Sequence, residues 1–383
     1  MTESVLGNKS IVFAGGGTGG HLLPGIAVAE QLTFLGPYQI TFVGSDRTVE
    51  QQIIESSGYQ HLSLPASSTS DLKRAPFRFL WNNSRAFFQA LRFLRKESPA
   101  VVIGLGGFAS VPVILAASWL KIPIVLLEQN IIPGRANQFL FSRSSLVCIS
   151  FAETLFTRNR SSAQSGQPRI VMTGNPVRKQ IAEAILRTEE IDHTAEVLIL
   201  ILGGSQGATA VNDAVVSMLE QAWSKLPKSL HVVHQTGVSG FASVNDAYQR
   251  LKKRSSHLRV TVQPFFADLT EWYARTDLVI SRAGATTLAE LTCLGLPAIL
   301  IPFPNSIRDH QLINARFYTE RGAALLVEQA QEPELTARLL GTLVVDLLHA
   351  DEERSTMSRK MHELAFPQAA CRVAEEVAGV IQG

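Results

Sequence analysis

A glycine-rich stretch near the start of the sequence ends in a histidine. Residues Gly15 to Gly20 lie directly before His21 and directly after the apolar run 11–14, which predicts a buried strand. A glycine turn between a strand and a helix exposes backbone N–H groups, and together with the helix dipole these groups favour an anion such as a phosphate. Pro24 is expected in the first turn of that helix. His21 adds a titratable ring, although a tight turn with a surface histidine would give the same pattern.

Polar or glycine-rich segments follow several other predicted strands. Residues Gly104 to Gly107 form a second glycine-rich loop, residues 128–130 read Glu-Gln-Asn, and residues 309–311 read Asp-His-Gln. Because ligands of open α/β sheets bind beyond the carboxyl ends of the strands, these segments are candidates for a binding site. Ordinary turns, solvated loops and helix starts are the alternative interpretations.

The most informative pattern in the second half begins where a predicted strand ends at Ile280. Gly284 allows a ligand to approach the backbone closely, and Thr286 and Thr287 are expected to cap the helix that follows. Glu290 would lie about one turn into this helix, where its carboxylate can accept hydrogen bonds from both hydroxyls of a ribose. A carboxylate that only complements the helix dipole is the alternative.

Short apolar runs alternate with helical patterns along most of the chain, which predicts an α/β fold. The runs lie at 11–14, 40–43, 101–103, 124–127, 146–149, 170–172, 197–202, 231–234, 260–262, 278–280, 298–301 and 324–327. Continuous apolar strands separated by helices indicate parallel sheets that are covered on both faces. The two sets predict two doubly wound domains joined near 175–196, and a final amphipathic helix is expected over 369–381.

Composition narrows the classes of function. Of the 383 residues 46% are hydrophobic and 18% charged, which is typical of soluble globular domains, and a net charge of +2 does not indicate nucleic-acid binding. The three cysteines are far apart, which indicates core residues in a reducing compartment rather than disulfides or a metal site. No signal peptide is recognised, and the most apolar region, 111–127, is interrupted by Lys121 and Pro123, so no membrane span is expected.

The first glycine-rich stretch also matches the dinucleotide fingerprint, but weakly. The acidic residue expected about 20 positions further on would have to be Asp46. The sequence has no Walker lysine at this loop, which argues against a P-loop nucleotidase, and it has no Asp-x-Asp pair. A nucleotide diphosphate held through a carboxylate-bound metal is therefore not predicted.

A basic segment between Asp71 and Glu97 differs from the rest of the chain. It contains no acidic residue, and bulky apolar residues alternate with seven cations: Lys73, Arg74, Arg78, Arg85, Arg92, Arg95 and Lys96. This combination suits the surface of an anionic membrane. The alternative is that the aromatic residues are core and the cations form a solvated face.

These motifs, in this order, closely resemble one family, the MurG glycosyltransferases, which move N-acetylglucosamine from UDP onto the membrane-bound muramyl-pentapeptide precursor of peptidoglycan. The resemblance runs from Ile11 to about Ala324. It implies a GT-B type fold, with two Rossmann-like doubly wound domains facing across a cleft. Residues 1–175 would form an acceptor- and membrane-facing domain and residues 176–366 a UDP-N-acetylglucosamine-binding domain. Residues 367–383 would form a helix that returns to the first domain.

The resemblance also implies roles for individual residues. His21 is the implied general base, Glu290 would bind the ribose, and Phe266 would contact uracil through its backbone. Ser205 would lie near the diphosphate and Gln311 near the sugar. The complete set implied for the donor is Thr18, Gly19, Gly20, Asn130, Arg178, Ser205, Phe266, Ala285, Thr286, Thr287, Leu288, Ala289, Glu290 and Gln311.

The implied reaction is an inverting displacement without metal or other cofactor, in which the acceptor's 4-hydroxyl attacks the anomeric carbon and UDP leaves. The implied partners are UDP-N-acetylglucosamine, the lipid-linked muramyl-pentapeptide acceptor and an anionic membrane surface, with the protein peripheral at the cytoplasmic face. Three positions depart from the family pattern: Phe108 replaces a common tyrosine, Leu127 a common histidine, and Arg308 an acidic or small residue. Only Arg308 bears on the site, because it changes the charge near the sugar.

Two other classes of protein fit part of the pattern. A Rossmann dehydrogenase would also carry glycine loops, but its ribose carboxylate should follow the second strand instead of lying at Glu290. A non-enzymatic nucleotide-sugar binding protein would share the donor residues, but it would not need His21 or the basic segment.

Overall fold

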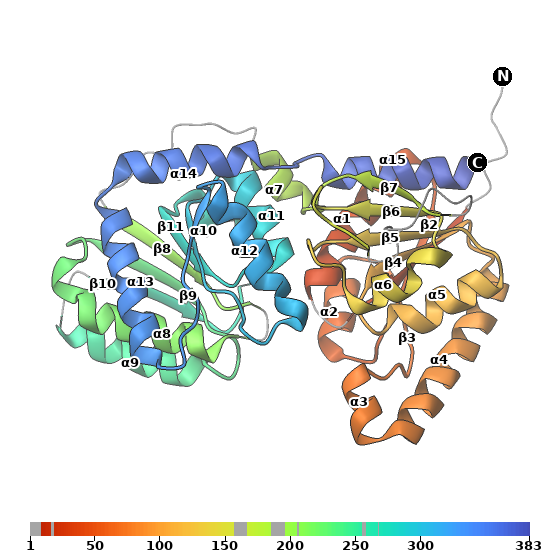
Figure 1. Ribbon diagram of the computed structural model, residues 1–383, viewed down its shortest axis with the longest axis horizontal. Coiled ribbons are helices and arrows are strands. Elements are labelled where there is room, and N and C mark those ends of the chain that lie inside the picture. The colour runs from red at the N-terminus through yellow and green to blue at the C-terminus, as the bar shows by residue number, and fades with distance from the viewer. Residues whose placement is uncertain are drawn as a thin grey trace. The chain divides into compact units, whose positions relative to one another are not determined.

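The computed structural model describes residues 9–16, 19–156, 167–184, 196–204, 207–254, 258–266 and 268–383. They fall into two compact units, which are coloured along the chain in Figure 1. Unit 1 comprises residues 1–179 and 366–383, and unit 2 comprises residues 180–365.

Unit 1 is built on a parallel sheet with strand order β3-β2-β1-β4-β5-β6-β7 (Figure 1). Its strands are β1 (Ser10–Gly15), β2 (Gln39–Gly44), β3 (Gln60–Ser63), β4 (Val101–Gly106), β5 (Ile124–Glu128), β6 (Leu146–Ile149) and β7 (Arg169–Met172). Its helical segments are α1 (Gly19–Leu35), α2 (Thr48–Ser56), α3 (Thr69–Arg74), α4 (Pro76–Glu97), α5 (Ser110–Trp119), α6 (Arg135–Leu140), η1 (Phe141–Arg143) and α15 (Ala369–Gln382). The helix α7 (Lys179–Ala184) begins at the boundary between the units.

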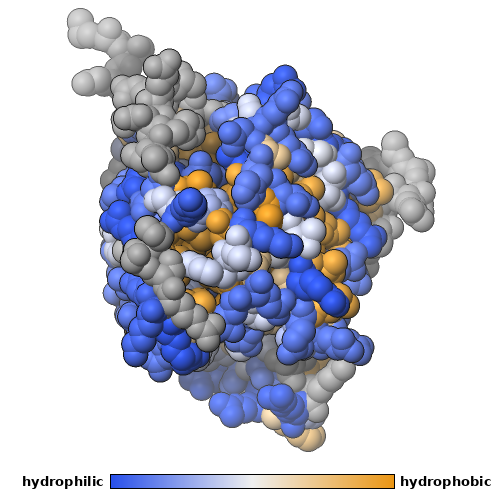
Figure 2. Space-filling view, turned by 90° about the vertical axis from the view of Figure 1, so that its left-hand side faces the viewer, coloured by the Kyte–Doolittle hydropathy of each residue, from blue (hydrophilic) through white to orange (hydrophobic). Residues whose placement is uncertain are grey.

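Unit 2 is built on a second parallel sheet, with strand order β10-β9-β8-β11-β12-β13. Its strands are β8 (Val197–Leu202), β9 (Leu230–Gln235), β10 (Leu258–Gln263), β11 (Leu278–Ser281), β12 (Ala298–Leu300) and β13 (Ala324–Leu326). Its helical segments are α8 (Thr209–Ala222), η3 (Trp223–Lys225), α9 (Phe241–Arg254), α10 (Thr270–Ala274), α11 (Ala285–Leu294), η4 (Ile307–Asp309), α12 (His310–Glu320), α13 (Pro333–Leu348) and α14 (Asp351–Glu363). Figure 2, seen from the end that carries β10 and α13, shows mostly hydrophilic residues with smaller hydrophobic areas between them.

The predicted α/β architecture with two parallel sheets is confirmed. Every apolar run that predicted a strand lies in an observed strand, to within one residue at its end. One strand, β3, was not predicted. Its residues are polar or only half-buried because it forms the edge of the sheet, so it lacks the continuous apolar run that marks the interior strands.

The start of α1 also differs from the prediction. The helix begins at Gly19, so His21 lies in its first turn and Pro24 lies inside it. Leu22, Ile26 and Ala29 are buried at positions i, i+4 and i+7, and this apolar stripe extends the helix ahead of the proline. Packing against the core thus outweighs the preference of proline for the first helical position.

The C-terminal helix α15 completes the core of unit 1. Its residues Val373, Ala374 and Val377 are buried in one cluster with Ile11 and Phe13 of β1. The helix packs against α1, and Glu376 forms an ion pair with Arg169 of β7. The amphipathic helix that the sequence predicts at this end of the chain is therefore present.

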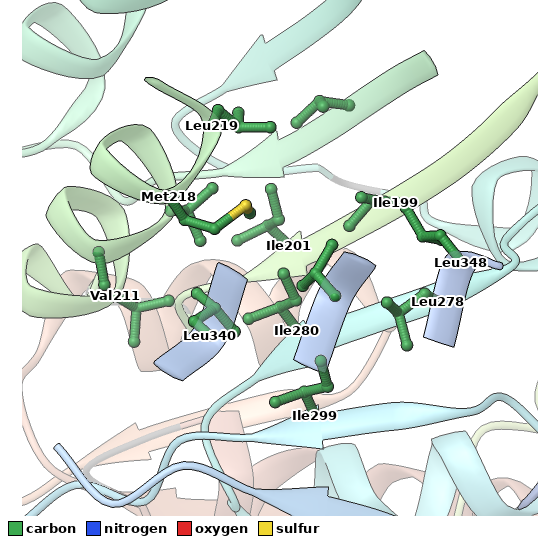
Figure 3. Close-up of a cluster of buried hydrophobic side chains, with 14 of the residues drawn as sticks. Ile199, Ile201, Val211, Met218, Leu219, Leu278, Ile280, Ile299, Leu340 and Leu348 are labelled. Atoms are coloured by element: carbon green, nitrogen blue, oxygen red, sulfur yellow. The ribbon is translucent and has the colours of Figure 1, made fainter. Parts of the chain in front are cut away.

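The core of unit 2 lies between its sheet and the helices α8 and α13. Figure 3 shows side chains of β8 and β11 pointing toward those of the two helices. The residues at this contact, each at most 1% exposed, include Ile199, Ile201, Ile280, Met218, Leu219 and Leu340. This packing fixes the strands of unit 2, and the predicted site residues lie on the segments that follow these strands.

Leu340→Ala should lower the free energy of unfolding by about 2–5 kcal/mol, because Leu340 is fully buried and its removal leaves a cavity. Its neighbour Leu339 is 47% exposed on the same helix, so Leu339→Ala should change that free energy by less than about 0.5 kcal/mol. Urea unfolding of the two variants measures the difference. Equal losses would contradict the placement of Leu340 in the core.

Candidate functional site

The predicted site residues that the structure describes lie beyond the carboxyl edges of the two sheets. In unit 1 the strand order turns between β1 and β4, and in unit 2 it turns between β8 and β11. Open α/β sheets bind their ligands at such switch points, because the neighbouring loops diverge there. His21 follows β1, and Glu290 follows β11. Each lies beside the switch point of its own sheet.

The second glycine-rich loop packs against the ring of His21. Gly106 and Gly107 have φ angles of 95° and 76°, which favour glycine. A Cβ atom at position 106 would lie 3.1 Å from Cδ2 of His21, and one at position 107 would lie 2.4 Å from the carbonyl oxygen of Gly16. The β4–α5 loop therefore forms one wall beside the imidazole, and side chains are excluded from that wall.

Glu128 organises the loop after β5. Its carboxylate accepts hydrogen bonds from the backbone N–H of Asn130 at 3.0 Å, the backbone N–H of Gly134 at 2.9 Å and the side-chain amide of Asn137 at 2.9 Å. Burial raises the pKa of Glu128, and these donors oppose the rise. The buried carboxylate of Glu128 thus fixes the position of the Asn130 backbone.

Only one member of the predicted polar triplet is placed to meet a ligand. Glu128 and Gln129 are buried, and Gln129 donates to the carbonyl oxygen of Leu105, whereas Asn130 is half-buried. The first two residues are structural, and Asn130 is the candidate contact. Leu127, one of the departures from the family pattern, is a core residue.

A carboxylate does lie beside the first glycine loop, but it is not Asp46. Glu50, in the first turn of α2, is buried and accepts hydrogen bonds from the backbone N–H and the hydroxyl of Ser45, at 2.9 and 2.6 Å. A Cβ atom at Gly16 would lie 2.2 Å from Glu50 Oε2. A dinucleotide-binding domain uses an acidic residue after β2 to bind a ribose, but here the carboxylate in that region, Glu50, is buried and bonded within the chain.

In unit 2 the nucleoside residues predicted by resemblance form the first turns of α11. Gly284, not a threonine, precedes the helix, so the prediction that Thr286 and Thr287 are caps was wrong. They are the second and third residues of the helix, where the backbone N–H groups already face the loop. Leu288 is fully buried in the core, and Thr286, Thr287 and Ala289 are half-buried.

Glu290 is held by a residue that the sequence analysis missed. Its Oε2 accepts a hydrogen bond of 3.0 Å from the hydroxyl of Tyr273 in α10, and both side chains are buried. No sequence pattern marks Tyr273, because it lies 17 residues before Glu290 on a different helix.

The loop that carries Phe266 is fixed by a buried glutamine. Gln235, the last residue of β9, accepts a hydrogen bond of 3.1 Å from the backbone N–H of Phe266 through Oε1. The ring of Phe266 meets Trp272 edge-on, with 6.2 Å between ring centroids. A uracil contact through the Phe266 backbone stays a prediction, and Gln235 determines where that backbone lies.

Arg282 and Gln311 together hold the loop after β12. Arg282 donates to the carbonyl oxygens of Ile301 and Pro302 at 3.0 and 2.9 Å, and burial lowers its pKa to about 10. Gln311 Oε1 accepts from the backbone N–H of Phe303 at 2.9 Å. The sequence analysis did not name Arg282 as a site residue. Its position directly after β11 could have identified it, because residues beyond strand ends are candidates for the site.

A buried polar chain supports the glycine loop after β8. Asn212 donates through Nδ2 to the carbonyl oxygen of Thr236 at 3.0 Å, so its Oδ1 accepts from His234 Nε2 at 3.0 Å. His234 Nδ1 then accepts from the hydroxyl of Tyr248 at 2.8 Å, and burial lowers the pKa of His234 to about 3, which keeps it neutral. A Cβ atom at Gly207 would lie 2.6 Å from the Thr236 oxygen, so the two loops pack backbone against backbone.

The remaining predicted residues are placed in part. Gly19 and Gly20 are the first residues of α1, and Arg178 is half-buried directly before α7. Thr18 and Ser205 lie outside the described residues. Within the part of the chain that the structure describes, no group of three His, Cys, Asp or Glu side chains is arranged to hold a metal ion.

Comparison with known proteins identifies the family. Residues 11–148 match the glycosyltransferase family 28 N-terminal domain and residues 198–373 match its C-terminal domain. A UDP-N-acetylglucosamine--N-acetylmuramyl-(pentapeptide) pyrophosphoryl-undecaprenol N-acetylglucosamine transferase of Myxococcus xanthus is 37% identical over 95% of this chain and 91% of its own. The protein with that name in Thermodesulfovibrio yellowstonii is 37% identical over 93% of this chain and 94% of its own. The crystal structure of Acinetobacter baumannii MurG has a TM-score of 0.72 at 29% identity, covering 97% of this chain and 99% of that one.

Two parallel-sheet domains that match both halves of family 28 define the class of protein, a glycosyltransferase with the GT-B fold. Within this class, the chain belongs to the MurG family. The fold class and the family that the sequence predicts are both confirmed.

Gly107→Ala should lower the free energy of unfolding by more than about 1–2 kcal/mol and displace the turn that carries His21. The alanine would adopt an unfavourable positive φ angle, and its Cβ would collide with the Gly16 carbonyl oxygen. Gly134→Ala is the matched control, because a Cβ there would meet nothing closer than 3.8 Å and the φ angle is −59°. Thermal unfolding of the two variants tests this, and equal stability would refute the close packing of the two loops.

Proposed function

We propose that this protein transfers N-acetylglucosamine from UDP-N-acetylglucosamine to the 4-hydroxyl of the lipid-linked muramyl-pentapeptide acceptor, with inversion at the anomeric carbon. The observation that carries the proposal is the position of His21. It lies at the switch point of the unit 1 sheet beside a side-chain-free glycine wall, in a chain that belongs to the MurG family. The relatives from Myxococcus xanthus and Thermodesulfovibrio yellowstonii carry the name of this transferase.

Unit 2 is the proposed donor-binding domain. Its carboxyl edge gathers a buried carboxylate at Glu290, a fixed loop at Phe266 and a polar side chain at Gln311. A ribose, a uracil and a sugar hydroxyl are the groups that these residues suit. Unit 1, which carries His21, is the proposed acceptor side, and its residues Asn130 and Arg178 are proposed contacts to the donor.

The reaction forms a bond between the acceptor oxygen and the anomeric carbon while the bond from that carbon to the β-phosphate oxygen breaks. The leaving diphosphate gains negative charge. The N-termini of α8 and α11 supply aligned backbone dipoles beside the unit 2 switch point, where they can stabilise this charge. His21 accepts the proton of the attacking hydroxyl, since histidine side chains exchange protons near neutral pH.

The two other classes of protein considered from the sequence are less well supported. A dehydrogenase would bind a dinucleotide ribose with an acidic residue that follows β2, but Glu50 there is buried, already accepts two hydrogen bonds from Ser45 and lies against the glycine loop. A binding protein without catalysis would not explain membership of a transferase family. A reaction without metal or other cofactor is part of the proposal.

The basic segment is the proposed membrane-docking surface. It forms α3 and α4, and the buried residues among the described side chains of these helices lie on one stripe of α4: Ala86, Ala90, Leu91 and Leu94. The large exposed apolar side chains are Leu72, Phe77, Leu80, Trp81 and Phe88, and Trp119 on the neighbouring helix α5 is 71% exposed. The arginines of α4 are exposed as well. Exposed aromatic residues beside cations favour reversible docking on an anionic bilayer, with the protein peripheral at the cytoplasmic face.

The described helices include none that is long and apolar enough to cross a bilayer.

Replacing Arg78, Arg85 and Arg92 together by glutamate should abolish co-sedimentation with anionic vesicles. Binding of the unaltered protein should weaken with added salt, because exposed charges are screened beyond about 8–10 Å at physiological ionic strength. The control carries the same charge change on exposed unit 2 residues, Lys228→Glu, Arg250→Glu and Arg338→Glu, and should still bind. Equal binding by the two triple variants would remove the basic segment from the membrane contact.

His21→Ala should lower kcat for transfer to a lipid-linked muramyl acceptor by about 10²–10⁴-fold while leaving the Kd for UDP nearly unchanged. Loss of a proton acceptor affects the chemical step and not donor binding. Steady-state kinetics and titration calorimetry measure the two quantities. A fall in kcat below about tenfold would mean that another group or water takes the proton. A joint loss of thermal stability and UDP affinity would mean that His21 only orders the turn.

A further inference from the structure

The short helix α10 joins the two parts of the proposed nucleoside site. On one side Trp272 meets the ring of Phe266, whose backbone N–H is held by Gln235. On the other side the hydroxyl of the next residue, Tyr273, donates to Glu290 Oε2 at 3.0 Å. One turn of helix therefore contacts both the loop proposed to bind the base and the carboxylate proposed to bind the ribose.

The contact between Tyr273 and Glu290 is well enclosed. Tyr273 is 3% exposed and Glu290 is 6% exposed, so the hydrogen bond forms largely out of water. A hydrogen bond to an ionised acceptor is stronger than one between neutral groups, and a low local dielectric strengthens it further. The Tyr273 hydroxyl is a neutral donor, so it orients the carboxylate without neutralising its charge.

Orientation matters for this carboxylate because a ribose presents two neighbouring hydroxyls in a fixed geometry. A free glutamate side chain would lose rotamer freedom when it bound them, and that loss would weaken binding. A glutamate already held by a tyrosine from a neighbouring helix has lost this freedom during folding. The held carboxylate should therefore distinguish a ribose from a sugar that lacks one of the two hydroxyls.

We propose that Tyr273 is a positioning residue that orients Glu290 toward the ribose and thereby sets the preference for UDP over 2′-deoxy-UDP. The inference rests on the proposed function, in which Glu290 binds the nucleoside. It adds a residue that acts through Glu290 and does not itself touch the ligand.

Titration calorimetry of the full-length protein with UDP and with 2′-deoxy-UDP tests the proposal. Tyr273→Phe should raise the Kd for UDP roughly 3- to 10-fold and the Kd for 2′-deoxy-UDP by less, because part of the lost contact involves the missing hydroxyl. The preference for UDP should fall toward that of Glu290→Ala. At saturating donor, kcat should be unchanged, since the carboxylate acts in binding.

Tyr248→Phe is the matched control. It removes another buried hydroxyl of unit 2, which is bonded to His234 Nδ1 at 2.8 Å, and it should affect stability without changing the preference for UDP over 2′-deoxy-UDP. A preference in Tyr273→Phe equal to that of the unaltered protein would overturn the proposal and leave Tyr273 a purely structural residue.

A double variant covers the case in which Tyr273→Phe is too unstable to titrate. Tyr273→Phe with Glu290→Ala leaves no buried charge without its donor, so it is the easier variant to fold. If Tyr273 acts through Glu290, the double variant should show the same UDP preference as Glu290→Ala alone. A further change would overturn the proposal. If Glu290→Ala leaves both affinities unchanged, the proposed nucleoside site itself fails, and the inference about Tyr273 fails with it.

Discussion

The parallel pairing of all strands within each sheet is the constraint on which the site depends. In a parallel sheet every strand needs a crossover to reach the next one, so each segment that leaves a strand begins at the same carboxyl edge. At the point where the strand order turns, the loops from β1 and β4, or from β8 and β11, diverge to opposite sides. Residues far apart in sequence, such as His21 and Gly106, meet there as a consequence.

The glycines of these loops serve close packing. Gly107 approaches the carbonyl oxygen of Gly16, and Gly207 approaches that of Thr236, at distances that leave no space for a Cβ atom. Both have positive φ angles, which other residues adopt at a cost. Backbone thus packs on backbone beside each switch point, and the glycine patterns that resemble phosphate loops are partly a signature of this packing.

Polar side chains behind the site then determine where the candidate contact residues lie. Glu128 holds Asn130, Gln235 holds Phe266, Arg282 holds the loop beside Gln311, and Tyr273 holds Glu290. Each contact is at least partly shielded from water, where hydrogen bonds are stronger and an unmade bond is costly. The candidate contact residues are therefore fixed by a supporting layer that a ligand need not touch.

The sequence by itself determined the strands, the glycine loops and the family, because these depend on local apolar runs and on motifs of adjacent residues. It did not reveal β3, whose edge position leaves it polar, or the true start of α1, which the apolar stripe of Leu22 and Ile26 extends past Pro24. Only the tertiary structure paired Tyr273 with Glu290 and Gln235 with Phe266, across 17 and 31 residues of chain. Such pairs have no characteristic separation along the sequence that a motif could reveal. They form only when the sheet brings segments that follow different strands together.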